Sequence, residues 1–81
     1  MKTREEVHGW LRGELSELLE LDPATVTFDA TLGELDIDSI DAVDVVVRFR
    51  DLTGKRVDPE VFRNVRTIGD VVEALHRLLE A

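Results

Sequence analysis

The stretch that decides the fold is residues 35–44, Leu35-Asp36-Ile37-Asp38-Ser39-Ile40-Asp41-Ala42-Val43-Asp44. Its acids are typical of a helix start, because the Asp38 carboxylate can cap exposed backbone N–H groups and Asp41 complements the helix dipole. Ser39 is therefore expected at the first helical position, with its hydroxyl exposed. The N–H groups and the positive dipole end of such a terminus can stabilise an attached phosphate.

A helix over 39–52 follows from this start. Its apolar residues recur at helical spacing, and arginines near its end complement the dipole. The valine-rich run has strand propensity, but the caps favour a helix, which Gly54 would stop. The two apolar stripes are Ile40, Val43 and Val46 or Val47, and Ala42, Val45, Phe49 and Leu52. Because they cover more than one face, we expect one side to pack and the other to expose hydrocarbon.

A first helix is predicted over 4–20, where Thr3 and Glu6 have the spacing of a capping box. Its apolar stripe is Val7, Trp10, Leu11, Leu15, Leu18 and Leu19, with Trp10 expected to anchor the core. Asp22-Pro23 is expected to end this helix, since the residue before proline avoids the α region.

A long connection, 22–37, leads from the first helix to the second. It has no sustained period, but it carries five large apolar residues, Val26, Phe28, Leu32, Leu35 and Ile37. We therefore expect the loop to lie on the core and not to extend into solvent.

Two further helices complete the expected bundle. Asp58 and Pro59 open a short one over 59–63, and Thr67 caps a last one over 68–80. The predicted fold class is all-α: a four-helix bundle with a long ordered loop between the first two helices and a short third helix. The whole chain, 1–81, is expected to form a single domain.

Length and composition exclude several classes of protein. The chain has 81 residues, a mass of 9.2 kDa and no cysteine, which excludes a disulfide framework and a thiol nucleophile. Two histidines, His8 and His76, are too few for a metal site or a catalytic triad, and both are expected at the surface. No apolar run suits a signal peptide or a membrane span, so we expect a monomeric cytoplasmic protein with no membrane partner.

Charge is distributed unevenly along the chain. The total, 18 acidic against 10 basic side chains, is −8, which disfavours nucleic acid as a partner. Residues 28–47 carry six acids and no base, whereas 48–66 carry six bases and three acids, a net of +3. The acidic block brackets Ser39, so it either presents that serine to other proteins or is only a solvated face.

Ser39 has no means of acting as a nucleophile by itself. A serine hydrolase needs a base within hydrogen-bond reach and an oxyanion hole, and neither histidine lies in this segment. No catalytic residue and no metal site are predicted, so the chain is not expected to be an enzyme. If Ser39 undergoes chemistry, the active site of another protein performs it.

At residues 35–44 the sequence resembles the acyl carrier protein family, the phosphopantetheine-binding four-helix bundles. The family pattern is leucine, glycine, a variable residue and Asp-Ser-Leu, followed by an apolar-acidic helix. The resemblance covers most of the chain. Segments 22–27, 53–57 and 65–72 are similar, in order, to the start of the family's first loop, the turn after its second helix and the start of its fourth helix.

This resemblance implies that Ser39 accepts a 4′-phosphopantetheine arm from coenzyme A. A separate phosphopantetheinyl transferase would attach the arm, and its thiol would hold an acyl intermediate as a thioester. Further implied partners are a ketosynthase, an acyltransferase or adenylating enzyme, and other enzymes of a fatty-acid-like or polyketide pathway, antibiotic biosynthesis included. The sulfur that the chain lacks would come with the cofactor.

Two positions depart from the family pattern. Asp36 stands where glycine is usual, so a left-handed backbone there would be adopted at some cost, although aspartate tolerates it better than most residues. Ile40 replaces leucine beside the serine, which leaves the identity of partner enzymes open.

Further roles surround Ser39. Asp38 is assigned to transferase recognition as well as to capping. The residues predicted to contact partners are Ile40, Asp41, Val43, Asp44, Val47 and Arg48. For the acids the alternative is solubility and dipole complementarity, and for the apolar residues it is core packing, most of all for Val47. With Arg50, Arg48 suggests a partner surface of mixed sign.

Two other functions stay open. A peptidyl carrier protein, loaded by an adenylating enzyme, fits the turn over 53–56 equally well. A protein of a different class, an unmodified acidic helical adaptor that only binds proteins, fits if Ser39 merely begins a helix. A gain in mass after incubation with coenzyme A and a transferase would separate carrier from adaptor.

Overall fold

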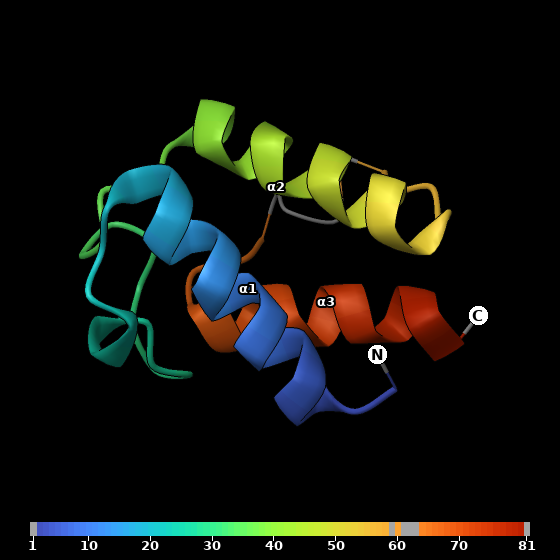
Figure 1. Cartoon of the computed structure of the whole chain (residues 1–81), viewed down its shortest axis with the longest axis horizontal. Helices are drawn as coiled ribbons and strands as arrows, with labels where there is room; N and C mark the ends of the chain where they lie inside the picture. Colours follow the sequence, from blue (N-terminus) through green and yellow to red (C-terminus); the bar gives the residue numbers. More distant parts are fainter. Residues whose placement is uncertain (1, 59, 61–63, 81) are drawn as a thin grey trace.

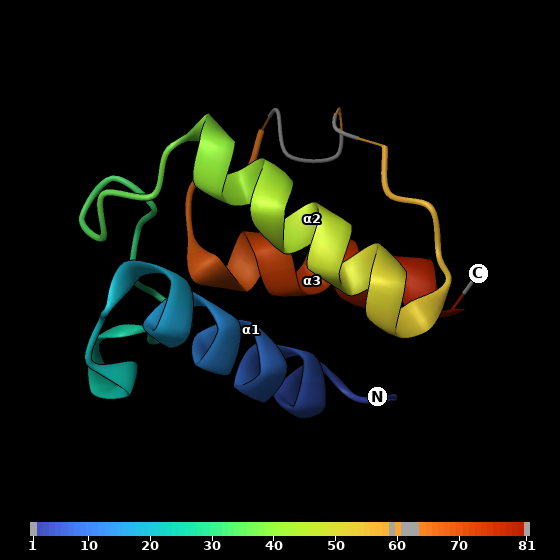
Figure 2. The ribbon, with the colours of Figure 1, turned by 45° about the horizontal axis from the view of Figure 1, so that its top comes forward.

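The structure, a computed structural model, describes residues 2–58, 60 and 64–80. These residues form three α-helices, α1 (Arg4–Leu19), α2 (Ser39–Thr53) and α3 (Ile68–Glu80), with a short 3-10 turn η1 at Pro23–Thr25. Figures 1 and 2 show α1 and α2 running in opposite directions, while α3 runs in the same sense as α2. The predicted all-α class is confirmed.

The described residues contain no strand, only an isolated bridge between Thr31 and Thr67. The short helix expected over 59–63 lies outside the described residues, except for Glu60. Among the helices that are described, none has the length and apolar character needed to cross a membrane.

Local capping sets the helix starts as predicted. At α1, Thr3 and Glu6 form a capping box: the Glu6 N–H donates to Thr3 Oγ1 and the Thr3 N–H donates to Glu6 Oε1, both at 3.2 Å. At α3, the Asp70 N–H donates to Thr67 Oγ1 and the Thr67 N–H donates to Asp70 Oδ2, both at 3.1 Å. These bonds satisfy N–H groups that the helices leave unpaired.

The end of α1 differs slightly from the prediction, which placed it at residue 20 before Asp22-Pro23. The helix ends at Leu19 because Glu20 turns into the left-handed region, with φ 54°, and its N–H donates to the Ser16 carbonyl. Asp22 instead caps η1, where the Ala24 N–H donates to its carboxylate at 3.0 Å.

The core gathers one face of each helix. Its fully buried members are Val7, Leu11 and Leu15 from α1, Phe49 from α2, Ile68, Val72 and Leu75 from α3, and Val26 from the long loop. Trp10 packs against this core, and its ring meets the Phe49 ring edge to face, with centroids 5.5 Å apart. The expectation that Trp10 anchors the core is confirmed.

The long loop lies on the core, as its apolar residues predicted. Its backbone is bonded to the segment around the start of α3: Leu32 N–H to the Arg66 carbonyl at 2.9 Å, Ile68 N–H to Ala30 at 2.9 Å, and Gly69 N–H to Phe28 at 2.8 Å. The Phe28 ring is 43% exposed, yet it covers Gly69 so closely that a Cβ there would collide with it.

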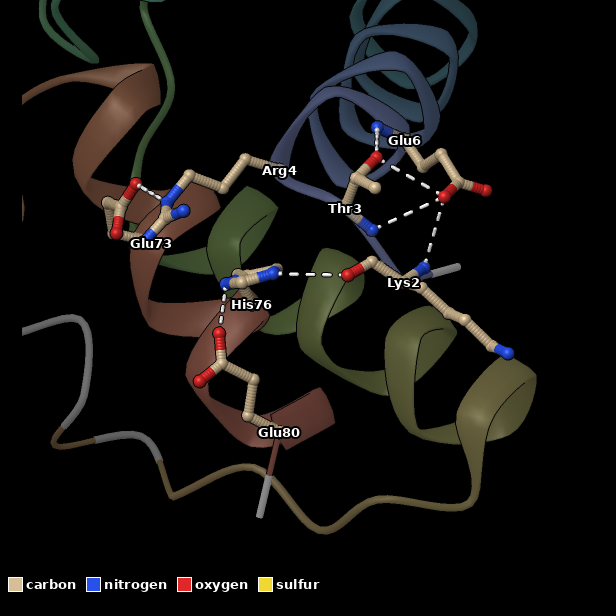
Figure 3. A network of polar contacts seen from close by, with 7 residues as sticks. All are labelled: Lys2, Thr3, Arg4, Glu6, Glu73, His76 and Glu80. Atoms are coloured by element: carbon tan, nitrogen blue, oxygen red, sulfur yellow. Dashed lines mark hydrogen bonds and ion pairs between the residues drawn. The ribbon is translucent and has the colours of Figure 1, made fainter.

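The expectation that both histidines lie at the surface is wrong for His76, which is only 7% exposed. Its Nε2 lies 3.2 Å from the Lys2 carbonyl oxygen and its Nδ1 lies 2.9 Å from Glu80 Oε1 (Figure 3). His8 is half-buried, with its Nε2 2.9 Å from the Val26 carbonyl oxygen. Both rings therefore contact backbone carbonyls that are far away in the sequence. No local sequence pattern predicts such contacts.

The His76 contact, together with an ion pair between Arg4 and Glu73, binds the beginning of the chain to α3 (Figure 3). The two ends of the chain therefore lie together, at the end of the bundle opposite the start of α2 (Figures 1 and 2).

Candidate functional site

Asp38 fixes the start of α2. The N–H groups of Ile40 and Asp41 each donate to Asp38 Oδ1 at 3.0 Å, and the Asp38 N–H donates back to Asp41 Oδ2 at 3.2 Å. This capping box makes Ser39 the first residue of α2, as the sequence predicts, and leaves the serine exposed. The Ser39 hydroxyl has no hydrogen bond to any residue that the structure describes.

The same bonds control the charge beside the serine. The Asp41 N–H, with smaller contributions from the Asp41 side chain and the Ile40 N–H, lowers the pKa of Asp38 below its ordinary value. Asp38 therefore carries its negative charge at neutral pH, one residue before Ser39. The Asp38 carboxylate thus both fixes the position of Ser39 and carries the negative charge beside it.

The chain reaches this cap through a left-handed residue. Asp36 has φ 55°, as expected for the position where the family pattern has glycine. Around it, the Asp36 N–H donates to the Gly33 carbonyl at 3.2 Å and the Ile37 N–H donates to the Leu32 carbonyl at 3.0 Å. This tight turn brings Ile37 onto the core just before Asp38.

A cavity of about 390 Å³ opens beside Ser39, between the three helices. Ser39 and Asp38 are its polar residues. Its other lining residues are apolar: Leu11 and Leu15 of α1, Ala42, Val43, Val45 and Val46 of α2, Ile68 and Val71 of α3, and Leu32, Ile37 and Val65 of the connecting segments. Val43, Val45 and Val46 supply the valine-rich part of this wall, but a void between helices depends on tertiary packing that no local pattern encodes.

The outer face of α2 exposes hydrocarbon, as predicted. Ile40 is 73% exposed, Val43 57% and Val47 41%. For Val47 the alternative of core packing is therefore excluded. Asp44 is exposed beside these residues, while Asp41 is half-buried through its part in the cap.

Arg48 forms an ion pair with α1 and also lies near Asp44 of its own helix, whose charge contributes to raising the pKa of the guanidinium. Its Nη1 lies 2.6 Å from Glu14 Oε2, and this contact raises the pKa of the guanidinium. No local pattern predicts this pair, because Glu14 stands 34 residues earlier in the chain. Arg48 and Arg50 are both exposed on α2.

The described residues hold no group of three or more His, Cys, Asp and Glu side chains that could bind a metal ion. Both histidine rings are held elsewhere, at Val26 and at Lys2, so neither serves Ser39 as a base. The site thus offers an exposed hydroxyl, an adjacent carboxylate and an apolar cavity. Such a set can receive a group from another protein's active site.

Comparison with known proteins agrees with this geometry. Residues 9–75 match the family model described as the phosphopantetheine attachment site. The chain is 46% identical to acyl carrier protein 2 of Ralstonia nicotianae over 80 residues, which cover 98% of this chain and 99% of that protein. It is 35% identical to the acyl carrier protein of Thermotoga maritima, with the same coverage. It is 33% identical to the meromycolate extension acyl carrier protein of Mycolicibacterium smegmatis, covering 96% of this chain and 80% of that one.

Proposed function

Since this chain belongs to the acyl carrier protein family, whose members hold 4′-phosphopantetheine covalently, we propose that Ser39 is its attachment residue. The protein is a carrier and not an enzyme, and it works with a phosphopantetheinyl transferase and with the enzymes of a synthase pathway. The observation that carries the assignment is the exposed, unbonded hydroxyl at the first position of the capped helix α2.

The residues around Ser39 fit a phosphodiester. The hydroxyl is exposed, and it stands at a helix N-terminus, whose positive dipole end favours an attached phosphate. Ser39 also belongs to the lining of the cavity, so a group attached to it would begin beside that space. The whole chain, 1–81, is proposed to act as one carrier domain.

Attachment uses coenzyme A as the donor. The Ser39 oxygen attacks the phosphorus that carries the pantetheine, a Ser–O–P bond forms, and the P–O–P bond of coenzyme A breaks. The leaving adenosine bisphosphate takes the bond's electron pair, and the serine proton passes to a base of the transferase. Once bound, the arm supplies a terminal thiol that carries an acyl group as a thioester.

Asp38 is proposed to serve the transferase in two ways. Its bonds to Ile40 and Asp41 hold the serine at the tip of α2, and its ionised carboxylate presents a negative charge beside the hydroxyl. The exposed apolar residues Ile40 and Val43, with Asp44 beside them, are proposed as the surface that partner enzymes contact.

The cavity favours an acyl cargo over a peptidyl one. Burying an alkyl chain gains about 0.8 kcal/mol per CH₂, whereas burying the charged ammonium of an aminoacyl group among apolar side chains is costly. The cavity beside Ser39 is lined by apolar side chains apart from Ser39 and Asp38. The three relatives named above are also called acyl carrier proteins, which supports a fatty-acid-like or polyketide pathway, with a ketosynthase and an acyltransferase among its enzymes.

The test is an intact mass after incubation with coenzyme A and a broad-specificity phosphopantetheinyl transferase. The wild type is expected to gain the mass of one phosphopantetheine group, and Ser39→Ala is expected to gain nothing. Ser16→Ala is the matched control, because Ser16 is the only other serine in the chain, and it should gain the same mass as the wild type.

Each unexpected result has a definite meaning. A wild type that gains no mass would refute the carrier assignment in favour of the adaptor. A gain that persists in Ser39→Ala would refute the site. Loading by an aminoacyl-adenylating enzyme, with no loading from acyl donors, would favour the peptidyl carrier.

A further inference from the structure

We propose that Arg50 is a specificity-determining residue, which pairs with a carboxylate of a pathway enzyme and so fixes the orientation of that enzyme on α2. This inference rests on the proposed function, in which enzymes visit the arm on Ser39 and contact the exposed apolar residues of α2. It extends that contact surface by a positive charge about three helical turns beyond the serine, and it states what the partner presents there, an acidic side chain.

The two arginines of α2 differ in what they contact. Arg48 is paired with Glu14 of α1 at 2.6 Å, and the charge of Asp44, four residues earlier on α2, adds to this attraction. Arg50 is exposed, and its side chain forms no ion pair with any residue that the structure describes. The positions one turn from it along the helix carry no charge: Val46, Val47, Thr53 and Gly54. Of the two arginines, Arg50 is therefore the one available to a partner.

Arg50 lies on the same side of α2 as Ser39. The two are 11 residues apart, which in a helix of about 3.6 residues per turn is about three full turns and roughly 16 Å along the axis. Val43 and Val47 stand between them at helical spacing and are 57% and 41% exposed. An enzyme that takes the arm at Ser39 and covers the two valines therefore reaches Arg50 with the same contact.

The charges beside the two valines are arranged by sign. Each residue advances about 100° around an α-helix, so Asp44 and Asp51 share one flank of the valine pair, whereas Arg50 lies on the other. Both acids are exposed. A partner in one orientation meets the acids with a base and Arg50 with an acid, but the same partner turned end for end sets like charges against each other. Because like charges disfavour a contact, the sign pattern selects one orientation.

The surroundings of Arg50 favour a protein carboxylate over other anions. The planar guanidinium matches a carboxylate in a two-bonded pair. A membrane of anionic lipids would meet Asp44 and Asp51 beside the arginine, and it would be repelled by a chain of net charge −8, as would a second copy of the chain. The phosphodiester of the arm would lie roughly 16 Å away at Ser39, too far to contact Arg50. A partner surface that carries an acid together with a base for the aspartates satisfies every charge in this patch.

The test follows the transfer of an acyl group from the loaded protein to a pathway enzyme. Wild type and variants are loaded from butyryl-coenzyme A to completion, as judged by intact mass. They are then mixed with the ketosynthase of the source organism that accepts the butyryl group from the wild type fastest. The second-order rate constant of transfer is measured at low salt and at about 1 M NaCl, where the Debye length is about 3 Å.

The variants change the charge at one position. Arg50→Glu sets a negative charge against the partner carboxylate, so it should lower the rate constant roughly tenfold at low salt and less than about twofold at high salt. Arg50→Lys keeps the charge and should retain most of the rate. Arg12→Glu is the matched control, because Arg12 is an exposed arginine of α1 and the change in net charge is the same. Its rate constant should stay within about twofold of the wild-type value.

A charge swap separates the sign pattern from the total charge. Arg50→Asp combined with Asp51→Arg leaves the net charge unchanged and exchanges the signs of the two flanks. It should lower the rate constant at low salt by roughly tenfold or more, because both flanks then face like charges. If the swap variant transfers at the wild-type rate, or if Arg12→Glu is as slow as Arg50→Glu, only the total charge matters and the inference is overturned.

The other outcomes are equally decisive. A wild-type dimer that Arg50→Glu dissociates, or binding to phosphatidylglycerol vesicles that Arg50→Glu abolishes, would assign the arginine to another occupant and overturn the inference. The inference also falls if no ketosynthase of the organism accepts the butyryl group. If loading gives no gain in mass, the proposed function itself fails. If loading is complete but Arg50→Glu transfers as fast as the wild type, the inference fails while the attachment at Ser39 stands.

Discussion

Asp36 shows how one residue can hold a functional loop in place at a cost. Its φ of 55° lies in the left-handed region, which costs most non-glycine residues about 1–2 kcal/mol, although aspartate tolerates it better than most. The turn it makes delivers Ile37 to the core and Asp38 to the cap of α2. The chain must turn at Asp36 in order to reach both the core and the cap. The strain at Asp36 is therefore part of the free-energy cost of placing Ser39 at the exposed start of α2.

This strain gives a stability prediction. Asp36→Ala should lower the free energy of unfolding by about 1 kcal/mol, because alanine lacks aspartate's tolerance for this region. Asp36→Gly should be more stable than Asp36→Ala, since glycine adopts the conformation without steric cost. Urea unfolding of the three proteins checks the order, and an alanine variant as stable as the glycine variant would contradict it.

Single residues also mark the limit of sequence reasoning. Ser39 could be placed at a helix start because its signals, Asp38 and Asp41, are local. His76 could not be placed, because its partner, the Lys2 carbonyl, is 74 residues away. The ion pair of Arg48 with Glu14 could not be predicted for the same reason, because it exists only once α1 and α2 pack together.

Among the helices, each described start is stabilised by an ionised carboxylate. Backbone N–H groups lower the pKa of Glu6 at α1, chiefly that of Lys2; of Asp38 at α2, chiefly that of Asp41; and of Asp70 at α3, chiefly that of Arg66. A lowered folded-state pKa means that the unfolded chain binds protons more readily. The stabilisation is therefore present above the ordinary pKa of about 4 and is lost as the pH falls through the folded-state pKa.

The caps thus predict that the protein loses stability in acid, and that part of this loss can be assigned to Asp38. Between about pH 5 and pH 3 the free energy of unfolding should fall, and Asp38→Asn should make that fall shallower, because asparagine caps without titrating. Asp51→Asn, which removes an exposed acid of α2 outside the cap, should follow the wild type. Equal slopes in wild type and Asp38→Asn would show that the Asp38 cap does not contribute.

Helices and caps were predictable because their signals lie within four residues of one another. The cavity was not, because it depends on small α2 side chains such as Ala42 facing α1 residues such as Leu15 across the bundle. The edge-to-face contact between Trp10 and Phe49 is equally nonlocal, since it joins α1 to α2. Local patterns therefore placed Ser39 at the start of α2 but did not predict the space beside it.

For the whole molecule, the main electrostatic property is self-repulsion. The net charge is −8 in a body of 30 × 22 × 20 Å, and the 28–47 segment, which has no base, gathers around the start of α2. Salt screens such repulsion, with a Debye length of about 10 Å at 0.1 M. A folded state that brings these acids together should therefore gain stability as salt is added.

This can be measured as the Tm between low and high NaCl, which is expected to rise. The double variant Asp29→Asn/Asp44→Asn removes two charges from the acidic block and should show a smaller rise. A wild-type Tm that falls with salt would mean that attractive ion pairs, such as Arg48 with Glu14, outweigh the repulsion.

The position of the chain ends has a practical consequence. The Lys2 carbonyl contacts His76, and both ends lie at the end of the bundle opposite the start of α2 (Figures 1 and 2). An affinity tag, a fluorescent fusion or a surface tether placed at either terminus would leave Ser39 pointing away from it. The molecule is thus suited to immobilisation with its modifiable end outward, which would let visiting enzymes be observed one at a time.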